Sequence, residues 1–191
     1  MLTVTDLWLP ILLSAVFVFV VSSIIHMALP IHKGDFRKLP GEDRILEAIR
    51  SQNVPRGAYM FPCAESMKDM GSPEMIEKCK RGPVGYVNIM PSGAPGLGKN
   101  LVQWFVYSLI IGVFVAYAAG LVLARGAEAM EVFRFAASVG ILAYATYEIP
   151  ASIWKGQRWS TTFKFVFDGV VYGLVTGGTF AWLWPAAVAA A

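Results

Sequence analysis

Four runs of apolar residues divide the chain, and none contains Asp, Glu, Lys or Arg: residues 7–25, 101–124, 135–147 and 169–191. A helix of about 20 apolar residues matches the roughly 30 Å hydrocarbon core of a bilayer. A helix also pairs its own backbone N–H and C=O groups, for which lipid offers no partners. The pattern therefore predicts an all-α integral membrane protein built on a four-transmembrane-helix bundle.

Tryptophan gathers at membrane interfaces, and the six tryptophans of the chain lie near the ends of the apolar runs. With these flanks included, the four predicted spans are Leu7–Leu29, Leu101–Ala124, Val132–Trp154 and Phe163–Trp184. The chain then divides into three parts. Residues 1–30 hold the N-terminal segment and the first span, residues 31–100 form a loop domain, and residues 101–191 hold the other three spans and a short tail.

The loop domain, residues 31–100, has its own alternating patterns of apolar and polar residues. Apolar residues share one face of residues 40–52, which predicts a short amphipathic helix, and residues 72–82 follow a second helical pattern. β-branched and aromatic residues in 82–91 favour a strand that pairs with residues 56–62 as a small β-hairpin. We therefore expect short helices and a small hairpin in this region.

Positive charge is distributed unequally between the two ends of the predicted spans. Eleven of the 16 Lys and Arg residues lie in the loop domain, and three more lie around the turn after the third span. Only Arg125 and Arg134 lie at the opposite end. Because positively charged segments stay cytoplasmic, we expect a multi-pass protein of the cell (inner or plasma) membrane, with a cytoplasmic loop domain and both termini outside.

Residues 92–100, SGAPGLGKN, match much of the phosphate-binding pattern GxxxxGK[ST] through Gly93, Gly98 and Lys99. In that motif the loop joins a buried strand to a soluble helix, and the last hydroxyl holds Mg²⁺. Here the last position is Asn100, and the helix that follows is a predicted membrane span. We interpret the stretch as an irregular elbow rich in glycine and proline, and expect no nucleotide.

Two histidines and two cysteines make a candidate set of metal ligands. His26 and His32 lie near the end of the first span, and Cys63 and Cys79 lie in the loop domain without CxxC spacing. Four nearby methionines add soft sulfur donors, which suit copper(I), whereas Cys and His together also suit zinc. The alternative is that these sulfur residues simply fill apolar gaps. A cytoplasmic loop keeps both thiols reduced, so a Cys63–Cys79 disulfide would contradict the predicted orientation.

Ionisable residues at membrane depth form a second candidate site. His26, Glu148 and Asp168 fall in the inner third of the predicted bilayer, and Lys164 shares a helix face with Asp168. A charged group at this depth is costly and faces a partner or a water-filled cavity. One interpretation is a proton or cation site. The other is a set of structural pairs, such as Glu148 with Lys164 or Asp168 with His26.

The fourth span carries Gly169, Gly173 and Gly177 at intervals of four residues. Such a ridge of small residues lets two helices approach closely. We therefore expect these glycines to pack against another helix of the bundle or against a second subunit.

Three functions are consistent with these patterns. The leading hypothesis is a non-enzymatic structural or accessory protein, either a homo-oligomer or a subunit among other membrane subunits. The first alternative is a proton or copper-like metal transporter or channel that uses the intramembrane cluster. The second is a membrane enzyme acting on a lipid or a quinone, although no catalytic grouping is recognisable.

The expected partners follow from composition. The bilayer itself is the main partner, and a copper or zinc ion or a bound lipid are the candidate cofactors. Basic residues in the loop domain alternate with eight acidic ones, whereas nucleic-acid binding requires a continuous basic surface. We therefore expect no nucleic acid.

Overall fold

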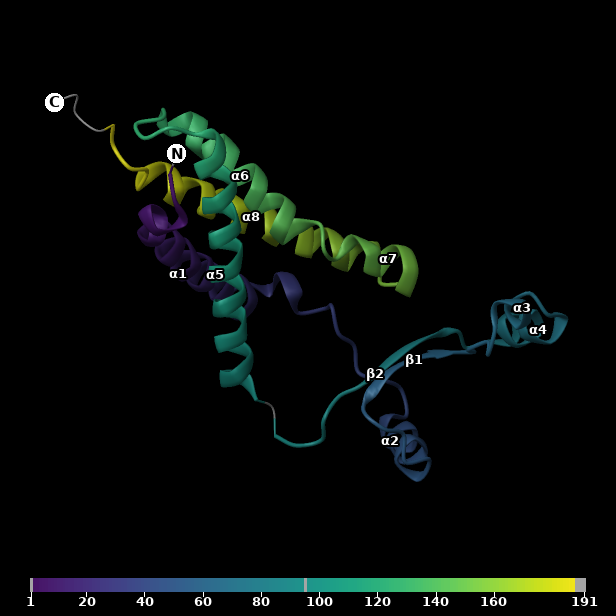
Figure 1. The fold of residues 1–191 in the computed structure, drawn as a ribbon. Coiled ribbons are helices and arrows are strands. Elements are labelled where there is room, and N and C mark those ends of the chain that lie inside the picture. The colour runs from purple at the N-terminus through teal and green to yellow at the C-terminus, as the bar shows by residue number, and fades with distance from the viewer. Residues whose placement is uncertain (1, 95, 188–191) are drawn as a thin grey trace. The chain divides into compact units, whose positions relative to one another are not determined.

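Residues 2–94 and 96–187 are described in a computed structural model of the chain (Figure 1). Four helical segments of these residues are long and apolar enough to span a membrane: Val4–Ala28, Leu97–Val122, Ala129–Lys155 and Trp159–Trp182. Each begins three or four residues before its predicted start and ends within two residues of its predicted end. The prediction of a mostly helical chain with four such helices is confirmed.

The first and third segments are not uniform α-helices. A 3₁₀ turn precedes the first helix and a π-helical turn ends it, and the third segment breaks after Ala145, close to Pro150. Pro150 disfavours an uninterrupted helix because it lacks the N–H that would donate within the helix and its ring clashes with the preceding turn. The elements are η1 (Val4–Leu7), α1 (Trp8–Ser23), η2 (Ile24–Ala28), α5 (Leu97–Val122), α6 (Ala129–Ala145), α7 (Ile149–Lys155) and α8 (Trp159–Trp182).

The predicted elbow before the second span requires a correction. Gly98, Lys99 and Asn100 belong to the first turn of α5, which begins at Leu97. The N–H groups of a first turn have no partner within the helix, so glycine costs less there than in a helix interior. Residues Leu97–Val122 therefore form one α-helix of 26 residues that includes the glycine.

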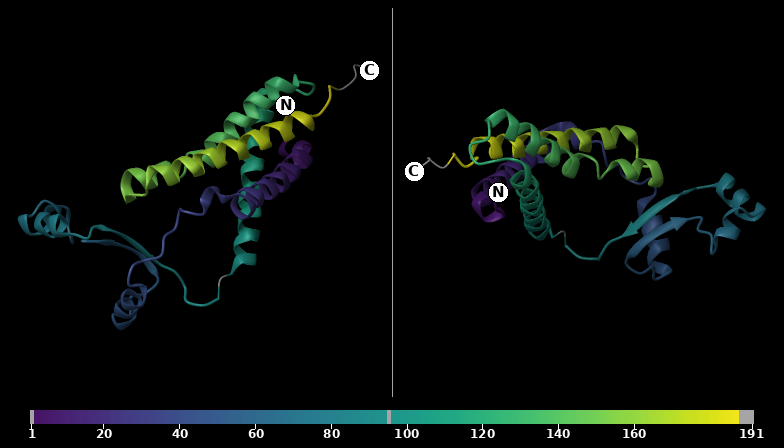
Figure 2. Two further views of the ribbon diagram at one scale, coloured as in Figure 1. Left: turned by 180° about the vertical axis from the view of Figure 1, so that it is seen from behind. Right: turned by 45° about the horizontal axis from the view of Figure 1, so that its top comes forward.

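Helices α6 and α8 run antiparallel and lie side by side along their length (Figures 1 and 2). Gly169, Gly173 and Gly177 of α8 face α6. An alanine Cβ at Gly169 would lie 2.4 Å from Cα of Ala145, and one at Gly173 would lie 2.5 Å from the backbone nitrogen of Ile141. Such contacts are too short for any side chain, so the ridge brings the two backbones together.

The two other long helices complete the bundle. Helix α1 packs against both α5 and α8, and α5 crosses α6 (Figure 1). The centre of the bundle is apolar, and Val18, Val115, Val132 and Phe180 are fully buried there. Several buried hydroxyls in these helices donate to carbonyls of their own helix, as Thr176 does to Tyr172 at 2.9 Å.

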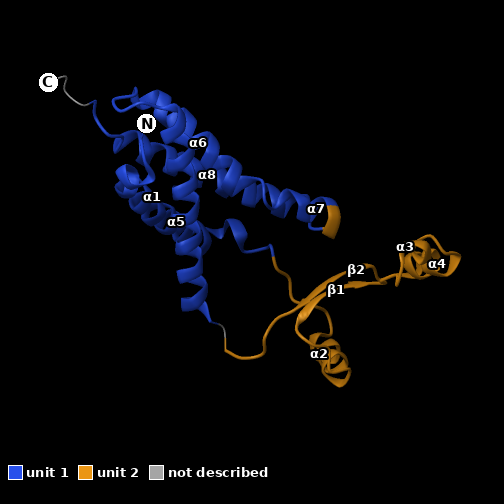
Figure 3. Ribbon diagram, in the orientation of Figure 1, with its two compact units in different colours: residues 1–35, 96–153, 157–191 blue, residues 36–95, 154–156 orange. Residues whose placement is uncertain are grey.

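The chain divides into two compact units (Figure 3). The helical unit comprises residues 1–35, 96–153 and 157–191, and the loop unit comprises residues 36–95 and 154–156. The elements of the loop unit are α2 (Glu42–Ser51), β1 (Gly57–Phe61), α3 (Met67–Met70), α4 (Pro73–Arg81) and β2 (Gly85–Ile89).

The two strands of the loop unit pair antiparallel, with Tyr59 opposite Val87. The predicted small two-stranded sheet is therefore confirmed. The strands are not joined by a tight turn, because α3 and α4 lie between them in the chain. No residue of the helices α2, α3 and α4 is buried, so this unit is held together mainly by backbone pairing between its strands.

Candidate functional site

The site begins where the first long helix ends. The N–H of Leu29 donates to the carbonyl of Ile24 at 3.1 Å, the five-residue spacing of a π-helix. Such turns occur frequently at functional sites. Pro30 then begins the short 3₁₀ turn η3 (Pro30–His32), since its ring cannot continue the hydrogen-bond ladder of η2.

After this turn the chain runs back along the first half of α8. His32 meets Asp168, and Asp35 meets Lys164 four residues earlier in α8. The guanidinium of Arg158, just before α8, donates to the carbonyl of Gly34 at 2.9 Å. Residues 30–35 are therefore held beside α8 by three successive polar contacts.

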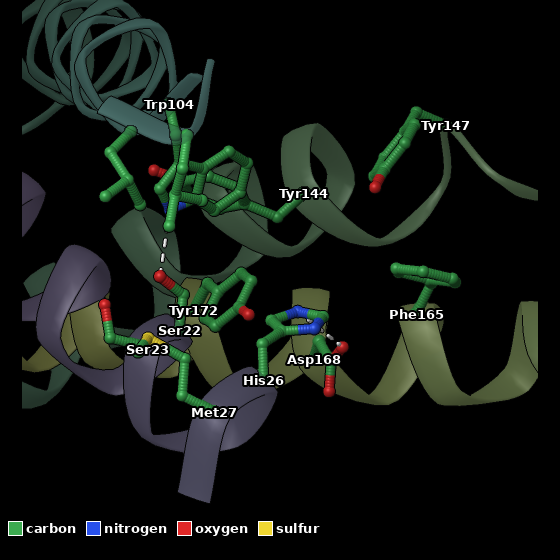
Figure 4. A pocket seen from close by; sticks show the side chains of 12 residues that line it. Ser22, Ser23, His26, Met27, Trp104, Tyr144, Tyr147, Phe165, Asp168 and Tyr172 are labelled. Atoms are coloured by element: carbon green, nitrogen blue, oxygen red, sulfur yellow. Dashed lines mark hydrogen bonds and ion pairs between the residues drawn. The ribbon is translucent and has the colours of Figure 1, made fainter. Parts of the chain in front are cut away.

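Two imidazoles and one carboxylate converge at the end of η2. Nε2 of His32 lies 2.8 Å from Oδ2 of Asp168, and Nε2 of His26 lies 3.5 Å from the same oxygen. The two imidazole rings stack with their centroids 4.3 Å apart. Figure 4 shows His26 and Asp168 directed toward one another from η2 and α8. One donor atom from each of the three residues lies within 4.8 Å of the others.

Asp35 orients the inner histidine. Its Oδ2 lies 2.6 Å from Nδ1 of His32, and its Oδ1 accepts a hydrogen bond from Nζ of Lys164 at 2.6 Å. With Nδ1 engaged in this way, Nε2 of His32 is left facing Asp168. Burial alone would raise the pKa of Asp35, but the hydrogen bonds and charges of Lys164 and His32 outweigh it and hold the pKa below its usual value.

The carboxylate of Asp168 is buried without a well-directed donor. The residue is 1% exposed, and neither of its oxygens accepts a hydrogen bond of good geometry from the described part of the chain. Nε2 of His32 is close enough for an ion pair, but the oxygen lies off the direction of a ring N–H bond. Buried charges require a counter-charge or a metal ion, and Asp168 has only the two imidazoles.

The charge balance of the cluster points the same way. Asp35 and Asp168 carry two buried negative charges, and Lys164 supplies one positive charge. With both histidines neutral, the cluster has one negative charge in excess. A single proton on an imidazole would restore neutrality, and a divalent metal ion would change the net charge of the cluster from −1 to +1.

Glu148 belongs to a different network. Its Oε2 accepts a hydrogen bond at 3.0 Å from Nε2 of Gln157, which also lies 2.9 Å from the hydroxyl of Thr162. The hydroxyls of Thr162 and Ser152 are 2.5 Å apart. These contacts join α7 to the start of α8. Glu148 was predicted to lie with His26 and Asp168, but in the structure its partner is Gln157.

The predicted metal set and the predicted intramembrane set do not stay together as groups in the structure. His26 and His32 come together with Asp168, whereas Cys63 and Cys79 are exposed, free thiols of the loop unit. Asp35 was not among the predicted site residues. Its signal was the spacing of three residues after His32, which places a carboxylate beside an imidazole across one turn.

The donor set fits a first-row divalent metal. Two ligands on a tetrahedral zinc ion with bonds of about 2.0–2.1 Å lie roughly 3.3 Å apart, and the two distances to Asp168 are 2.8 and 3.5 Å. Imidazole and carboxylate suit zinc and iron, whereas copper(I) prefers sulfur. A carboxylate bonded to the far nitrogen of a ligating histidine is a common support for such sites, and Asp35 occupies that position.

A cavity of about 340 Å³ adjoins the site (Figure 4). His26 and Asp168 form part of its wall, and the rest is mostly apolar and aromatic, including Trp104, Tyr144 and Tyr172. The cavity volume falls in the range of small-molecule pockets. The polar cluster is therefore reached from an apolar, open-sided space.

Comparison with protein-family models, with curated proteins and with solved structures found no match to this chain.

Proposed function

We propose that this chain is a multi-pass membrane protein that binds one divalent first-row metal ion through His26, His32 and Asp168. The observation that carries the proposal is the convergence of Nε2 of both histidines on one buried carboxylate. The geometry favours this function over a purely structural role, because a structural pair needs only one imidazole for one carboxylate.

The membrane part of the proposal is supported by the four long apolar helices and by the distribution of positive charge. Lys and Arg concentrate in the loop unit and around the start of α8, which favours a cytoplasmic position for the end of the molecule that carries the metal ligands. The metal site would then lie a few turns inside the bilayer and be supplied from the cytoplasm.

A bound ion is favoured over a path across the bilayer. Among the described residues of the four long helices, Asp168 is the one buried charged residue. The buried side chains beyond it are apolar, as at Val18, or hydroxyls that donate to their own helix, as at Thr176. Ion pathways across a membrane are marked by ionisable side chains. The site therefore fits an ion that is held at one end of the bundle.

Zinc titration tests the metal site directly. The purified full chain, stripped with a chelator, is titrated with Zn²⁺ by isothermal calorimetry, and the bound metal is counted by elemental analysis. We expect one zinc ion per chain, and at least hundredfold weaker binding in His32→Ala. The matched control is the double change Cys63→Ser with Cys79→Ser, which should bind zinc like the native chain.

Two outcomes would overturn the proposal. One is unchanged zinc affinity in a folded His32→Ala protein. The other is loss of zinc in the cysteine double variant alone, which would move the metal to the loop unit. If zinc does not bind at all and an imidazole titrates instead, the cluster carries a proton, which is the second function that its charge balance allows.

Orientation is tested through Cys63, which is exposed. A membrane-impermeant maleimide applied to intact cells should leave Cys63 unlabelled in a Cys79→Ser background, and label it after permeabilisation. Labelling of intact cells would place the loop unit outside and reverse the proposed orientation.

A further inference from the structure

The cavity beside the metal ligands has an exposed opening and a buried, aromatic inner wall. Its lining comes from the end of the first long helix, the first turns of α5, the end of α6 and the middle of α8. Met27, Leu97 and Tyr147 are its most exposed members, with 79%, 63% and 52% of their surface accessible. The opening is therefore apolar, as suits a ligand whose hydrocarbon part stays in the bilayer.

The inner wall is aromatic and held in place by its neighbours. The ring of Tyr172 packs edge-on against Trp104 and Tyr144, with centroids 5.8 and 5.7 Å apart. The indole nitrogen of Trp104 donates to the hydroxyl of Ser22 at 2.9 Å. Aromatic faces and edges pack well against another flat ring, so the wall suits a planar ligand group.

One hydroxyl on this wall has no partner. Tyr172 is 4% exposed, and its hydroxyl makes no hydrogen bond with the described residues. Figure 4 shows this hydroxyl directed toward His26, on the side of the cavity where Asp168 also lies. A buried donor without an acceptor is costly, and an oxygen-bearing ligand in the cavity would supply the acceptor.

The charge of the lining limits the head group. Among residues 2–94 and 96–187, no Lys or Arg borders the cavity, and Asp168 is the one carboxylate in its lining. A phosphate head would bring its own negative charge to a wall that has no lysine or arginine to pair with it, whereas a neutral carbonyl brings no charge. Neutral, planar and acceptor-bearing are the properties that the lining selects.

We propose that this cavity binds a neutral amphipathic molecule with a planar, carbonyl-bearing ring and a hydrocarbon chain, which is the chemistry of an isoprenoid quinone. The ring lies against Trp104 and Tyr172, one carbonyl accepts a hydrogen bond from the Tyr172 hydroxyl, and the chain leaves past Met27. The proposal goes beyond metal binding. Two of the metal ligands, His26 and Asp168, line the cavity and His32 does not, so a change at His32 removes a metal ligand without altering the lining.

The test uses the full chain in nanodiscs of neutral lipid, titrated with decyl-1,4-benzoquinone and followed by quenching of tryptophan fluorescence. We expect saturable binding that Tyr172→Phe weakens roughly tenfold, the effect of one lost hydrogen bond to a ligand. Without quinone, the thermal midpoint of Tyr172→Phe should be equal to or above that of the native chain, because only an unpaired hydroxyl is removed. Tyr117→Phe is the matched control, since Tyr117 is exposed on α5 and lies outside the lining.

A second pair of variants tests the entrance without touching the inner wall. Met27→Trp should narrow the mouth and weaken binding, whereas Val20→Trp, an exposed position of α1 outside the lining, should leave binding unchanged. His32→Ala should keep quinone affinity while losing zinc, which separates this proposal from the metal site.

Three results would overturn the proposal. The first is quenching that rises without saturation, which indicates simple partition into lipid. The second is equal quinone affinity in native, Tyr172→Phe and Met27→Trp proteins. The third is tighter binding of dihexanoyl-phosphatidylglycerol than of the quinone with the same dependence on Tyr172, which would assign the cavity to an anionic lipid.

Discussion

Two acidic residues of the helical unit, Glu148 just before α7 and Asp168 in α8, differ in the side chains that surround their carboxylates. The carboxylate of Glu148 accepts a hydrogen bond from the side-chain amide of Gln157. The same amide also contacts the hydroxyl of Thr162. Asp168 faces two imidazoles and accepts no well-directed hydrogen bond from the described residues. The carboxylate of Glu148 therefore has a hydrogen-bond donor within the protein. That of Asp168 has none of good geometry among the described residues, so an ion can serve as its partner.

The two carboxylates also differ in how far their partners lie along the chain. Gln157 is nine residues from Glu148, so that network closes the turn between α7 and α8. His26 and His32 reach Asp168 from the far end of the first long helix, and Asp35 reaches Lys164 across 129 residues. The network of Glu148 is local and stabilises one turn. The network of Asp168 is long-range, and it forms only if the chain folds back after Pro30.

The strongest test of this contrast compares the two isosteric changes Asp168→Asn and Glu148→Gln. Asp168→Asn removes the charged ligand and should weaken zinc binding at least hundredfold, since a metal ion needs the deprotonated carboxylate. Glu148→Gln should leave zinc affinity within a factor of two. Calorimetric titration of both folded proteins gives the comparison, and equal losses in the two variants would merge the clusters into one site.

Asp35→Asn should have the next largest effect. The amide cannot hold Nδ1–H of His32 as firmly as a carboxylate, so the imidazole loses both its fixed orientation and part of its basicity. Loss of such a supporting carboxylate costs 10- to 100-fold in metal affinity. Equilibrium dialysis with Zn²⁺ measures the effect, and Asp69→Asn in the exposed loop unit is the control. Native affinity in Asp35→Asn would mean that packing of the His32 ring against His26 and Phe165 is enough to orient it.

How much of this arrangement follows from the sequence differs between the fold and the site. Apolar runs predicted the four long helices to within four residues, because burial in lipid leaves few alternatives to a helix. Counting residues along the spans also placed His26 and Asp168 at similar depth, and the structure brings their side chains to 3.5 Å.

The positions of Glu148 and His32 could not be predicted from their depth in the membrane alone. Glu148 has nearly the depth of Asp168, but the break after Ala145 turns it toward Gln157 instead. His32 was grouped with the cysteines, because no periodicity shows that the chain turns back along α8 after Pro30. The direction of a chain leaving a helix is set by long-range contacts such as that of Arg158 with Gly34.

Lys164→Gln tests the stability of the long-range network rather than its metal affinity. The change leaves the buried carboxylate of Asp35 with only His32 as a partner. Breaking a fully buried ion pair costs 3–5 kcal/mol, and because Lys164 is 31% exposed, about 1–2 kcal/mol is expected here after screening by solvent. Thermal unfolding of the metal-free protein should show the loss, and Lys155→Gln, at the exposed end of α7, should not.

The smallest effect is expected for Glu148→Ala. This change removes the acceptor of Gln157 and leaves its amide to find Thr162 or water, so the free energy of unfolding should fall by about 1 kcal/mol. Thermal unfolding measures that loss, and the zinc titration should be unchanged because no contact joins Glu148 to the three metal ligands. Gln157→Ala is the matched variant: it removes the same hydrogen bond from the other side together with the contact to Thr162, so its stability loss should be at least as large. If Glu148→Ala instead abolished zinc binding in a folded protein, Glu148 would belong to the metal site. The contrast between Glu148, which is paired within the protein, and Asp168, which is available to a metal ion, would then no longer hold.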